Sequence, residues 1–241
     1  MKNKSLFRET FEFKETRGLI LSDSKEAIAS AISSLRENRE KLERYVRRNP
    51  EFLYSLTPIR VNNDAPLVAK IMAEAAAKAG VGPMAAVAGA LADLAVREMV
   101  SAGAKVAVVE NGGEVSAISE SPVDIALLAQ GTPLSRKIGF RLEKFPVGVA
   151  TSSATFGHAL SLGKADAVTI FSKNACMADA AATAVCNAVK GGNVDLAIKR
   201  GIEEALSIDD VEGVLIIFKG KVAIAGEIPR LINITDTELL L

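Results

Sequence analysis

The chain has 241 residues, of which 49% are hydrophobic but only 5% aromatic, and it contains no tryptophan. A chain of this length can bury a sizeable core, which must here be built mainly from Ala, Val, Ile and Leu. Lys and Arg together number 29, as do Asp and Glu, so the formal net charge at pH 7 is zero. Such a balance gives no long-range attraction to nucleic acid or to an anionic membrane, and we expect neither as a partner.

The two cysteines, Cys176 and Cys186, lie ten residues apart on one expected helix. Ten helical residues span about 15 Å, which is too far for a disulfide between them. The first residues are charged rather than apolar, unlike a secretory signal, and no uncharged apolar run reaches about 18 residues. We therefore expect a cytoplasmic protein without a membrane-spanning segment.

The first part of the chain predicts a hairpin followed by a long helix. Residues 5–22 alternate apolar and polar side chains in part, as paired strands do. Asp23 with Glu26 three residues later is typical of a helix start, and an apolar stripe then continues to Asn49. The outer face of this helix mixes Arg and Lys with Glu. That mixture favours a solvated face with ion pairs over a basic recognition helix.

Residues 66–79 predict a second helix, and residues 80–103 predict a third in which small side chains dominate. Alanines and Gly89 leave part of the third helix almost free of side chains. Such a surface suits either tight packing on a sheet or the close approach of another backbone or a flat ligand. Asp93 is the first charge along this helix, and Arg97 one turn later is its expected partner. Alanine-rich faces also mediate association, so a homodimer is one candidate oligomeric state.

Residues 105–110 and 114–119 predict two strands joined at Gly112 and Gly113. Two adjacent glycines permit positive φ angles and let another backbone or a ligand come close. A plain hairpin turn explains the same pair equally well.

A hydroxyl-rich loop follows the strand expected at residues 147–151. It contains Thr151, Ser152, Ser153 and Gly157 and ends at the only histidine of the chain, His158. Hydroxyls and free backbone N–H groups suit a phosphate, although they also cap loop backbone. His158, with a reference pKa of about 6.5, is either a general acid or base or a structural residue.

Asp179 and Thr183 lie four residues apart on an expected helix, so their oxygens share one face. A carboxylate and a hydroxyl so placed suit a hard cation such as Mg²⁺, which keeps waters for a phosphate-bearing partner. The same spacing also occurs in ordinary solvated helices.

The remaining elements are predicted from apolar runs and turn residues, and the segment at 131–145 is expected to be a polar, basic connection. The other predictions are strands at 123–129 and 167–171, a helix at 194–206, a hairpin of 214–218 with 222–225, and an apolar tail at 232–241. Helices and strands alternate without a clear break, so we expect one domain over residues 1–241, with two structural lobes as one arrangement.

Three stretches and their spacing resemble the ApbE-like superfamily, whose best-known members are Mg²⁺-dependent flavin transferases, and most closely an uncharacterised branch of it. The stretches are GVGPMAAVAGALAD at 80–93, GVATSSATFGHALSLGKADAV at 148–168 and ADAAATA at 178–184. The resemblance covers most of the chain. It implies an α+β (mixed α/β) protein with an ApbE-like fold, in which mixed sheets are flanked by helices.

The resemblance also implies site residues. In the transferases an A-D-x-x-x-T-A helix supplies a carboxylate and a hydroxyl to Mg²⁺, and Asp179 and Thr183 match these positions. The N-x-G-G-D turn corresponds to Glu110-Asn111-Gly112-Gly113-Glu114, which keeps both glycines but changes the residues that flank them.

Other motif positions are kept only in part. Of the A-K-G-Y-A-x-D segment, Gly89 and Asp93 are kept, whereas Ala88 and Ala90 replace Lys and Tyr. Thr151-Ser152-Ser153 stands where the transferases have T-S-G, and the later D-P-x-T-G part is missing.

Three hypotheses follow from the resemblance and its departures. The first is a Mg²⁺-dependent transferase or hydrolase acting on a phosphorylated, nucleotide-like or flavin-like small molecule such as FAD or FMN. Transfer of FMN onto a protein does not follow from what is kept. The second is a non-catalytic flavin or nucleotide carrier or sensor, and the third is a structural partner without a small-molecule site.

Overall fold

The computed structural model describes residues 6–129, 132–153 and 163–234. Within these residues the strands form two sheets in which every pair is antiparallel. The larger sheet has the order β1-β2-β3-β4-β7-β8-β9-β10, and the smaller has the order β11-β6-β5. The expected α+β class is confirmed, but the sheets are antiparallel rather than mixed, and short turns join β1 to β2, β3 to β4 and β9 to β10.

The larger sheet consists of β1 (Phe7–Phe13), β2 (Thr16–Ser22), β3 (Val106–Asn111), β4 (Glu114–Ser119), β7 (Val147–Ser152), β8 (Ala167–Ser172), β9 (Val211–Phe218) and β10 (Lys221–Gly226). The smaller sheet consists of β5 (Val123–Ala126), β6 (Ile138–Leu142) and β11 (Arg230–Asn233). The helices are α1 (Lys25–Arg48), α2 (Pro50–Tyr54), α3 (Leu67–Ala79), the 3-10 turn η1 (Pro83–Ala86), α4 (Val87–Ser101), α5 (Ala175–Ala188) and α6 (Val194–Ser207).

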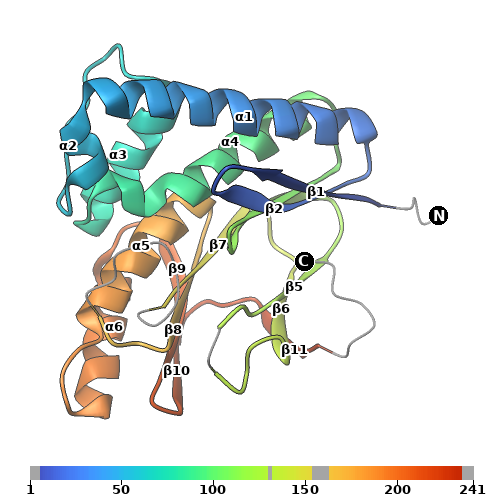
Figure 1. Cartoon of the computed structure of the whole chain (residues 1–241). Coiled ribbons are helices and arrows are strands. Elements are labelled where there is room, and N and C mark those ends of the chain that lie inside the picture. The colour runs from blue at the N-terminus through green and yellow to red at the C-terminus, as the bar shows by residue number, and fades with distance from the viewer. Residues whose placement is uncertain (1–5, 130–131, 154–162, 235–241) are drawn as a thin grey trace.

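The larger sheet lies between two hydrophobic cores. The long helices cover one face, where Ile20, Val109 and Ile170 pack with helix residues. The smaller sheet covers part of the other face, where Phe140 stacks edge-on against Phe171 with ring centroids 4.8 Å apart. Figure 1 shows the helices on one side of the sheet and β5, β6 and β11 on the other. The core is made largely of small aliphatic residues, as the composition predicts.

Two sequence predictions are corrected by the fold. The connection expected at 131–145 contains β6, in which Phe140 and Leu142 are buried while Arg141 pairs with Asp124. The basic residues around this short strand conceal its apolar alternation. The helix cap is Ser24 rather than Asp23, since the Ser24 hydroxyl accepts a hydrogen bond from the Ala27 N–H.

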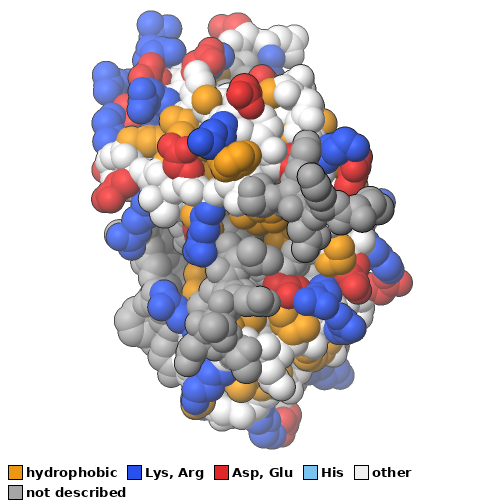
Figure 2. Space-filling view, turned by 90° about the vertical axis from the view of Figure 1, so that its right-hand side faces the viewer, with side chains coloured by type: hydrophobic (Ala, Val, Ile, Leu, Met, Phe, Trp, Pro, Cys, Tyr) orange, Lys and Arg blue, Asp and Glu red, His pale blue; other side chains and the backbone are white. Residues whose placement is uncertain are grey.

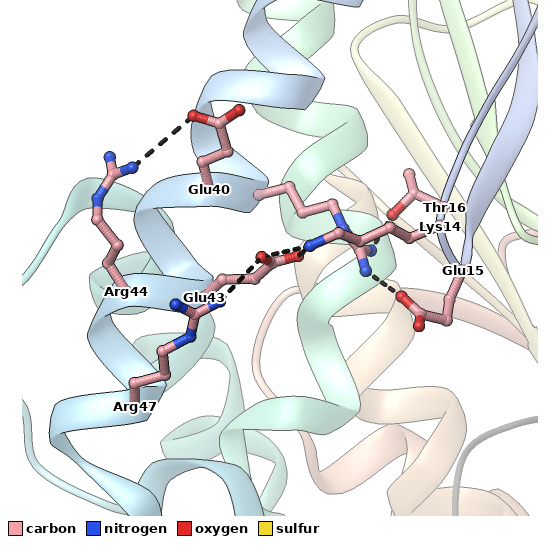
Figure 3. A network of polar contacts seen from close by, with 8 residues as sticks. Lys14, Glu15, Thr16, Glu40, Glu43, Arg44 and Arg47 are labelled. Atoms are coloured by element: carbon pink, nitrogen blue, oxygen red, sulfur yellow. Dashed lines mark hydrogen bonds and ion pairs between the residues drawn. The ribbon is translucent and has the colours of Figure 1, made fainter.

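The outer face of α1 carries ion pairs, as expected from its interleaved charges. Glu37 pairs with Lys41 and Glu40 with Arg44, each one turn apart. Figure 3 shows how this face also holds the β1–β2 hairpin.

Two cations make the link between the hairpin and α1. Arg39 donates hydrogen bonds to Thr16, Glu15 and Glu43, and Lys14 donates to the same Glu43 carboxylate at 2.6 Å. The network positions the hairpin against the helix. On the face seen in Figure 2, acidic and basic side chains are interspersed, in keeping with the balanced net charge.

In the described part of the chain, no single helix has the length and apolar character of a membrane span. The bent pair Leu67–Ala79 and Pro83–Ser101, with 105° between its members, meets the length and composition requirements only when the two helices are taken together.

Candidate functional site

Strand pairing brings two of the predicted site segments to the same end of the larger sheet. The β3–β4 hairpin turns at Gly112 and Gly113, whose φ angles of 72° and 118° require glycine. In the β4–β7 ladder Val115 lies opposite Val149. Because the strands are antiparallel, two residues further along the ladder Gly113 lies beside Thr151. The glycine turn and the hydroxyl-rich end of β7 are therefore neighbours.

The beginning of α4 lies against α5 at the same end of the sheet. A Cβ atom at Gly89 would come within 2.2 Å of the Ala175 carbonyl oxygen, so only glycine allows the two helices to lie this close. The Gly89 N–H donates a hydrogen bond of 3.0 Å to the Asp179 carboxylate. Of the two interpretations left open for the small-residue surface, tight packing is confirmed at Gly89, although the neighbour is another helix rather than a sheet.

Asp179 occupies an environment that disfavours its charge. Burial raises its pKa from 3.8 to about 7, even though hydrogen bonds from the backbone of Gly89 and Ala88 favour the ionised form. Burial also raises the pKa of Glu114 well above its usual range, and the negative charges of Asp179 and Glu110 raise it further. A bound cation would relieve this accumulation of negative charge.

Thr183 lies one turn after Asp179 on α5, and only 7% of the residue is exposed. Within the described residues, no hydrogen bond of its hydroxyl to another group is found. A threonine hydroxyl that has no partner among the described residues, one turn from a destabilised carboxylate, is a ligand pair that suits Mg²⁺. In the part of the chain that the structure describes, no group of three or more His, Cys, Asp or Glu is arranged around a metal position. A magnesium ion held here would therefore keep several coordination positions for water or phosphate.

Asp93 lies on α4 one turn after Gly89, where its carboxylate caps the start of α5. One oxygen accepts from the Ser116 hydroxyl at 2.7 Å and from the Ala175 N–H at 2.9 Å. The other accepts from the Cys176 N–H at 2.8 Å. Burial raises the pKa of Asp93, whereas these hydrogen bonds and the positive charge of Arg97 lower it. Arg97, the expected partner, therefore acts on Asp93 only through its nearby charge. Asp93 thus fixes the helix that carries Asp179 and Thr183.

The hydroxyl-rich loop is described only at its beginning. Thr151 and Thr169 lie opposite one another, with their hydroxyl oxygens 2.9 Å apart, and Ser152 is the last residue of β7. Ser153 is also described and has an interaction partner. The predictions for Gly157 and His158 fall outside the described residues.

Three polar residues of the β3–β4 hairpin belong to this site but were not predicted as site residues. Glu110 accepts a hydrogen bond of 2.6 Å from the Gly113 N–H, and Glu114 lies close enough to Asp179 for their charges to repel. The buried Asn111 side chain donates to the Ala88 carbonyl at 2.9 Å and so fixes the start of α4. The signal in the sequence was the pair of acidic residues that flank Asn-Gly-Gly.

Together these segments form an oxygen-rich site at one end of the sheet. The β3–β4 turn, the end of β7, the start of α4 and the second turn of α5 contribute to it. Carboxylates and hydroxyls bind hard cations. In the glycine turn the Gly112 N–H already donates to the Arg17 carbonyl and the Gly113 N–H to Glu110, so the turn offers close approach of its backbone rather than free donors. The arrangement can hold a cation together with a phosphate-bearing molecule.

Comparison with known sequences gives consistent similarities over nearly the whole chain. A family model described as AbpE bacteria matches residues 3–222. The UPF0280 protein MJ1526 of Methanocaldococcus jannaschii is 41% identical over 239 residues, covering 98% of this chain and 96% of that protein. The UPF0280 protein MK0206 of Methanopyrus kandleri is 42% identical over 224 residues, covering 92% and 91% of the two chains.

Two solved structures with a similar fold are described as flavin transferases. The apo form of Pseudomonas stutzeri flavinyl transferase ApbE is similar with a TM-score of 0.56 at 15% identity, covering 92% of this chain and 94% of that one. The flavin transferase ApbE of Vibrio cholerae has a TM-score of 0.52 at 14% identity, covering 92% and 97%. At these identities the likeness shows that the fold is ApbE-like, as expected.

Proposed function

The chain belongs to the UPF0280 family, whose family model is described as AbpE bacteria, and from this premise we propose a Mg²⁺-dependent enzyme. Its substrate is a phosphorylated small molecule of the nucleotide or flavin class, such as FAD or FMN. Both cysteines are free and buried, which fits the cytoplasmic location that we include in the proposal.

One observation carries the proposal: Asp179, whose pKa is raised, lies one helical turn from Thr183, whose hydroxyl has no partner among the described residues. When bound, Mg²⁺ would neutralise phosphate charge and polarise a phosphoryl oxygen. The chain's own groups would do the rest of the work. The Gly89 N–H holds the Asp179 carboxylate in place, and Asp93 fixes the start of α5.

The groups around the metal position would orient the ligand. The Gly112–Gly113 turn would let the ligand come close to the backbone, and the Thr151–Ser153 segment would place hydroxyl groups beside its phosphates. His158 is proposed to donate or transfer a proton, because its side chain is the only imidazole in the chain and follows the hydroxyl-rich segment.

The test is direct measurement of ligand binding to the purified protein with and without Mg²⁺. We expect FAD or FMN to bind more tightly with Mg²⁺, and Asp179→Asn to remove the Mg²⁺ dependence while keeping the fold. Asp195→Asn is the matched control, since Asp195 lies on α6 in an exposed ion pair with Lys221. An identical Mg²⁺ dependence in Asp179→Asn and in the unchanged protein would reject the metal assignment.

A second candidate, a non-catalytic flavin or nucleotide carrier or sensor, is favoured by a specific observation. Ala88 and Ala90 replace the Lys and Tyr of the transferase motif, and Ala90 is completely buried in the helix-side core. The chain therefore has no polar side chain from this turn of α4 to offer a substrate. Chemical change of bound FAD or FMN in the presence of Mg²⁺, followed by mass spectrometry, would exclude a purely binding role.

A further inference from the structure

A cavity lies between α3, α4, β4 and the first turn of α5. Its volume is about 440 Å³, within the range of small-molecule pockets. Of the residues assigned to the candidate functional site, only Asp93 lines it, and Asp93 is there as the internal cap of α5. Asp179, Thr183 and the glycine turn do not line this cavity. It is therefore distinct from the proposed magnesium site.

One part of the cavity wall is apolar and open to solvent. Val100 on α4 and Ile118 on β4 are 40% and 38% exposed, and both face the cavity. Single exposed aliphatic residues are ordinary on protein surfaces. Here two of them, from different elements, converge with Pro146 and the buried Met177 on one concavity. The wall offers an apolar body several contacts at once.

Another part of the wall carries cations that the rest of the described chain leaves unpaired. Arg97 and Lys173 line the cavity and are exposed, and within the described residues neither forms an ion pair. Lys78, the third cation, is instead held by Asp210 at 2.6 Å. Asn174 adds a neutral donor, since its side-chain oxygen is used by the Met177 N–H while its amide nitrogen is not used by any described group.

The carboxylates of the same wall are already engaged. Asp93 accepts three hydrogen bonds, Asp210 is paired with Lys78, and Glu74 lies 4.0 Å from that same lysine. The formal charges of the cavity sum to zero, but the unpaired groups that remain are positive or neutral donors. An incoming acceptor therefore meets free donors rather than free carboxylates.

We propose that this cavity binds a small organic carboxylate with a short apolar body. The carboxylate would lie between Arg97 and Lys173 and accept from the Asn174 amide, because charged donors bind carboxylates more strongly than neutral ones. The apolar body would lie against Val100 and Ile118. This function is independent of the magnesium site, so the two proposals succeed or fail separately.

The test uses hexanoate as the probe and methyl NMR of the full-length protein as the readout. Val100, Ile118, Ile71 and Met177 carry methyl groups in the cavity wall and report binding directly. We expect saturable shifts in these methyl signals with hexanoate. Hexan-1-ol has the same apolar chain without the charge, and inorganic phosphate has charge without an apolar chain. Both should therefore bind at least about tenfold more weakly than hexanoate.

Variants then test the two cations. Arg97→Gln with Lys173→Gln should raise the Kd for hexanoate about tenfold, which is the size expected for losing a charged hydrogen bond. Arg200→Gln, at an exposed arginine of α6 outside this cavity, is the matched control and should leave the Kd unchanged. No shift at the cavity methyls, equal binding of hexan-1-ol, equal competition by phosphate, or an unchanged Kd in the double variant would each overturn the proposal.

Discussion

The charge of Asp179 gives a prediction that can be tested on the protein without any ligand. Its raised pKa means that folding holds a proton on this carboxyl between about pH 4 and about pH 7, where the unfolded chain has released it. Stability contributed by the neutral carboxyl is present at pH 4 and is lost as the pH rises towards 7. We expect Asp179→Asn, which cannot ionise and can still accept from Gly89, to remove this loss.

The size follows from the change in pKa. A rise from 3.8 to about 7 corresponds to an upper limit on the order of 4 kcal/mol, at about 1.4 kcal/mol for each pKa unit. The negative charge of Asp93 contributes a small part of that figure, and Asp179 is only partly buried, so we expect a measured effect of a few kcal/mol.

The assay is urea unfolding of both proteins at pH 4 and at pH 8 without divalent cations. The difference between variant and unchanged protein removes the contribution of the titrating groups that do not interact with Asp179. At pH 8 Asp179→Asn should be more stable by a few kcal/mol, and at pH 4 the two should agree within about 1 kcal/mol. Added Mg²⁺ should then stabilise the unchanged protein at pH 8 but not the variant.

Either of two results would refute the reasoning about this carboxyl. If Asp179→Asn is no more stable than the unchanged protein at pH 8, ionised Asp179 is not disfavoured by its surroundings. If Mg²⁺ stabilises both proteins equally, the ion binds elsewhere.

Three further substitutions test the architecture. Gly89→Ala should destabilise the fold by several kcal/mol, because its Cβ would meet a backbone carbonyl of α5. Gly192→Ala, with open space around it, is the control and should leave the thermal unfolding midpoint unchanged. Equal midpoints in the two variants would contradict the close approach of α4 and α5. Asp93→Ala should cost about 3 kcal/mol in urea unfolding, since three donors lose their acceptor, and a loss under 1 kcal/mol would disprove the capping role. Arg39→Ala should cost on the order of 1 kcal/mol, reduced by salt, and Arg44→Ala should leave stability unchanged; similar losses in both would count against the hairpin link.

Most elements could be predicted from local patterns. The long helices follow from apolar stripes, and the hairpin around Gly112 and Gly113 follows from turn residues between apolar runs. The pattern failed at β6, a strand of only five residues that contains Gly139 and Arg141, and only the partner strands reveal its buried face.

The assembly of the candidate site could be predicted only in part. The Asp179–Thr183 pair depends on helical spacing, which one sequence shows. Glu114 lies beside Asp179 because β4 pairs with β7 and α5 packs against the sheet. Neither contact has a signal in the local sequence. The same reason explains Asp93, whose hydrogen-bond partners on α5 lie more than eighty residues away.

The strand β11 has a consequence for how the molecule folds. Arg230 lies opposite Arg141 in the smaller sheet, so the loop that this pairing closes contains β7, β8, α5, α6, β9 and β10. Closing so long a loop costs conformational entropy that β5 and β6, joined locally, do not pay. Across small proteins, folding becomes slower as the mean sequence separation of the contacts rises. We therefore expect the smaller sheet to complete late, after α5 and its carboxylate have already been placed against the larger one.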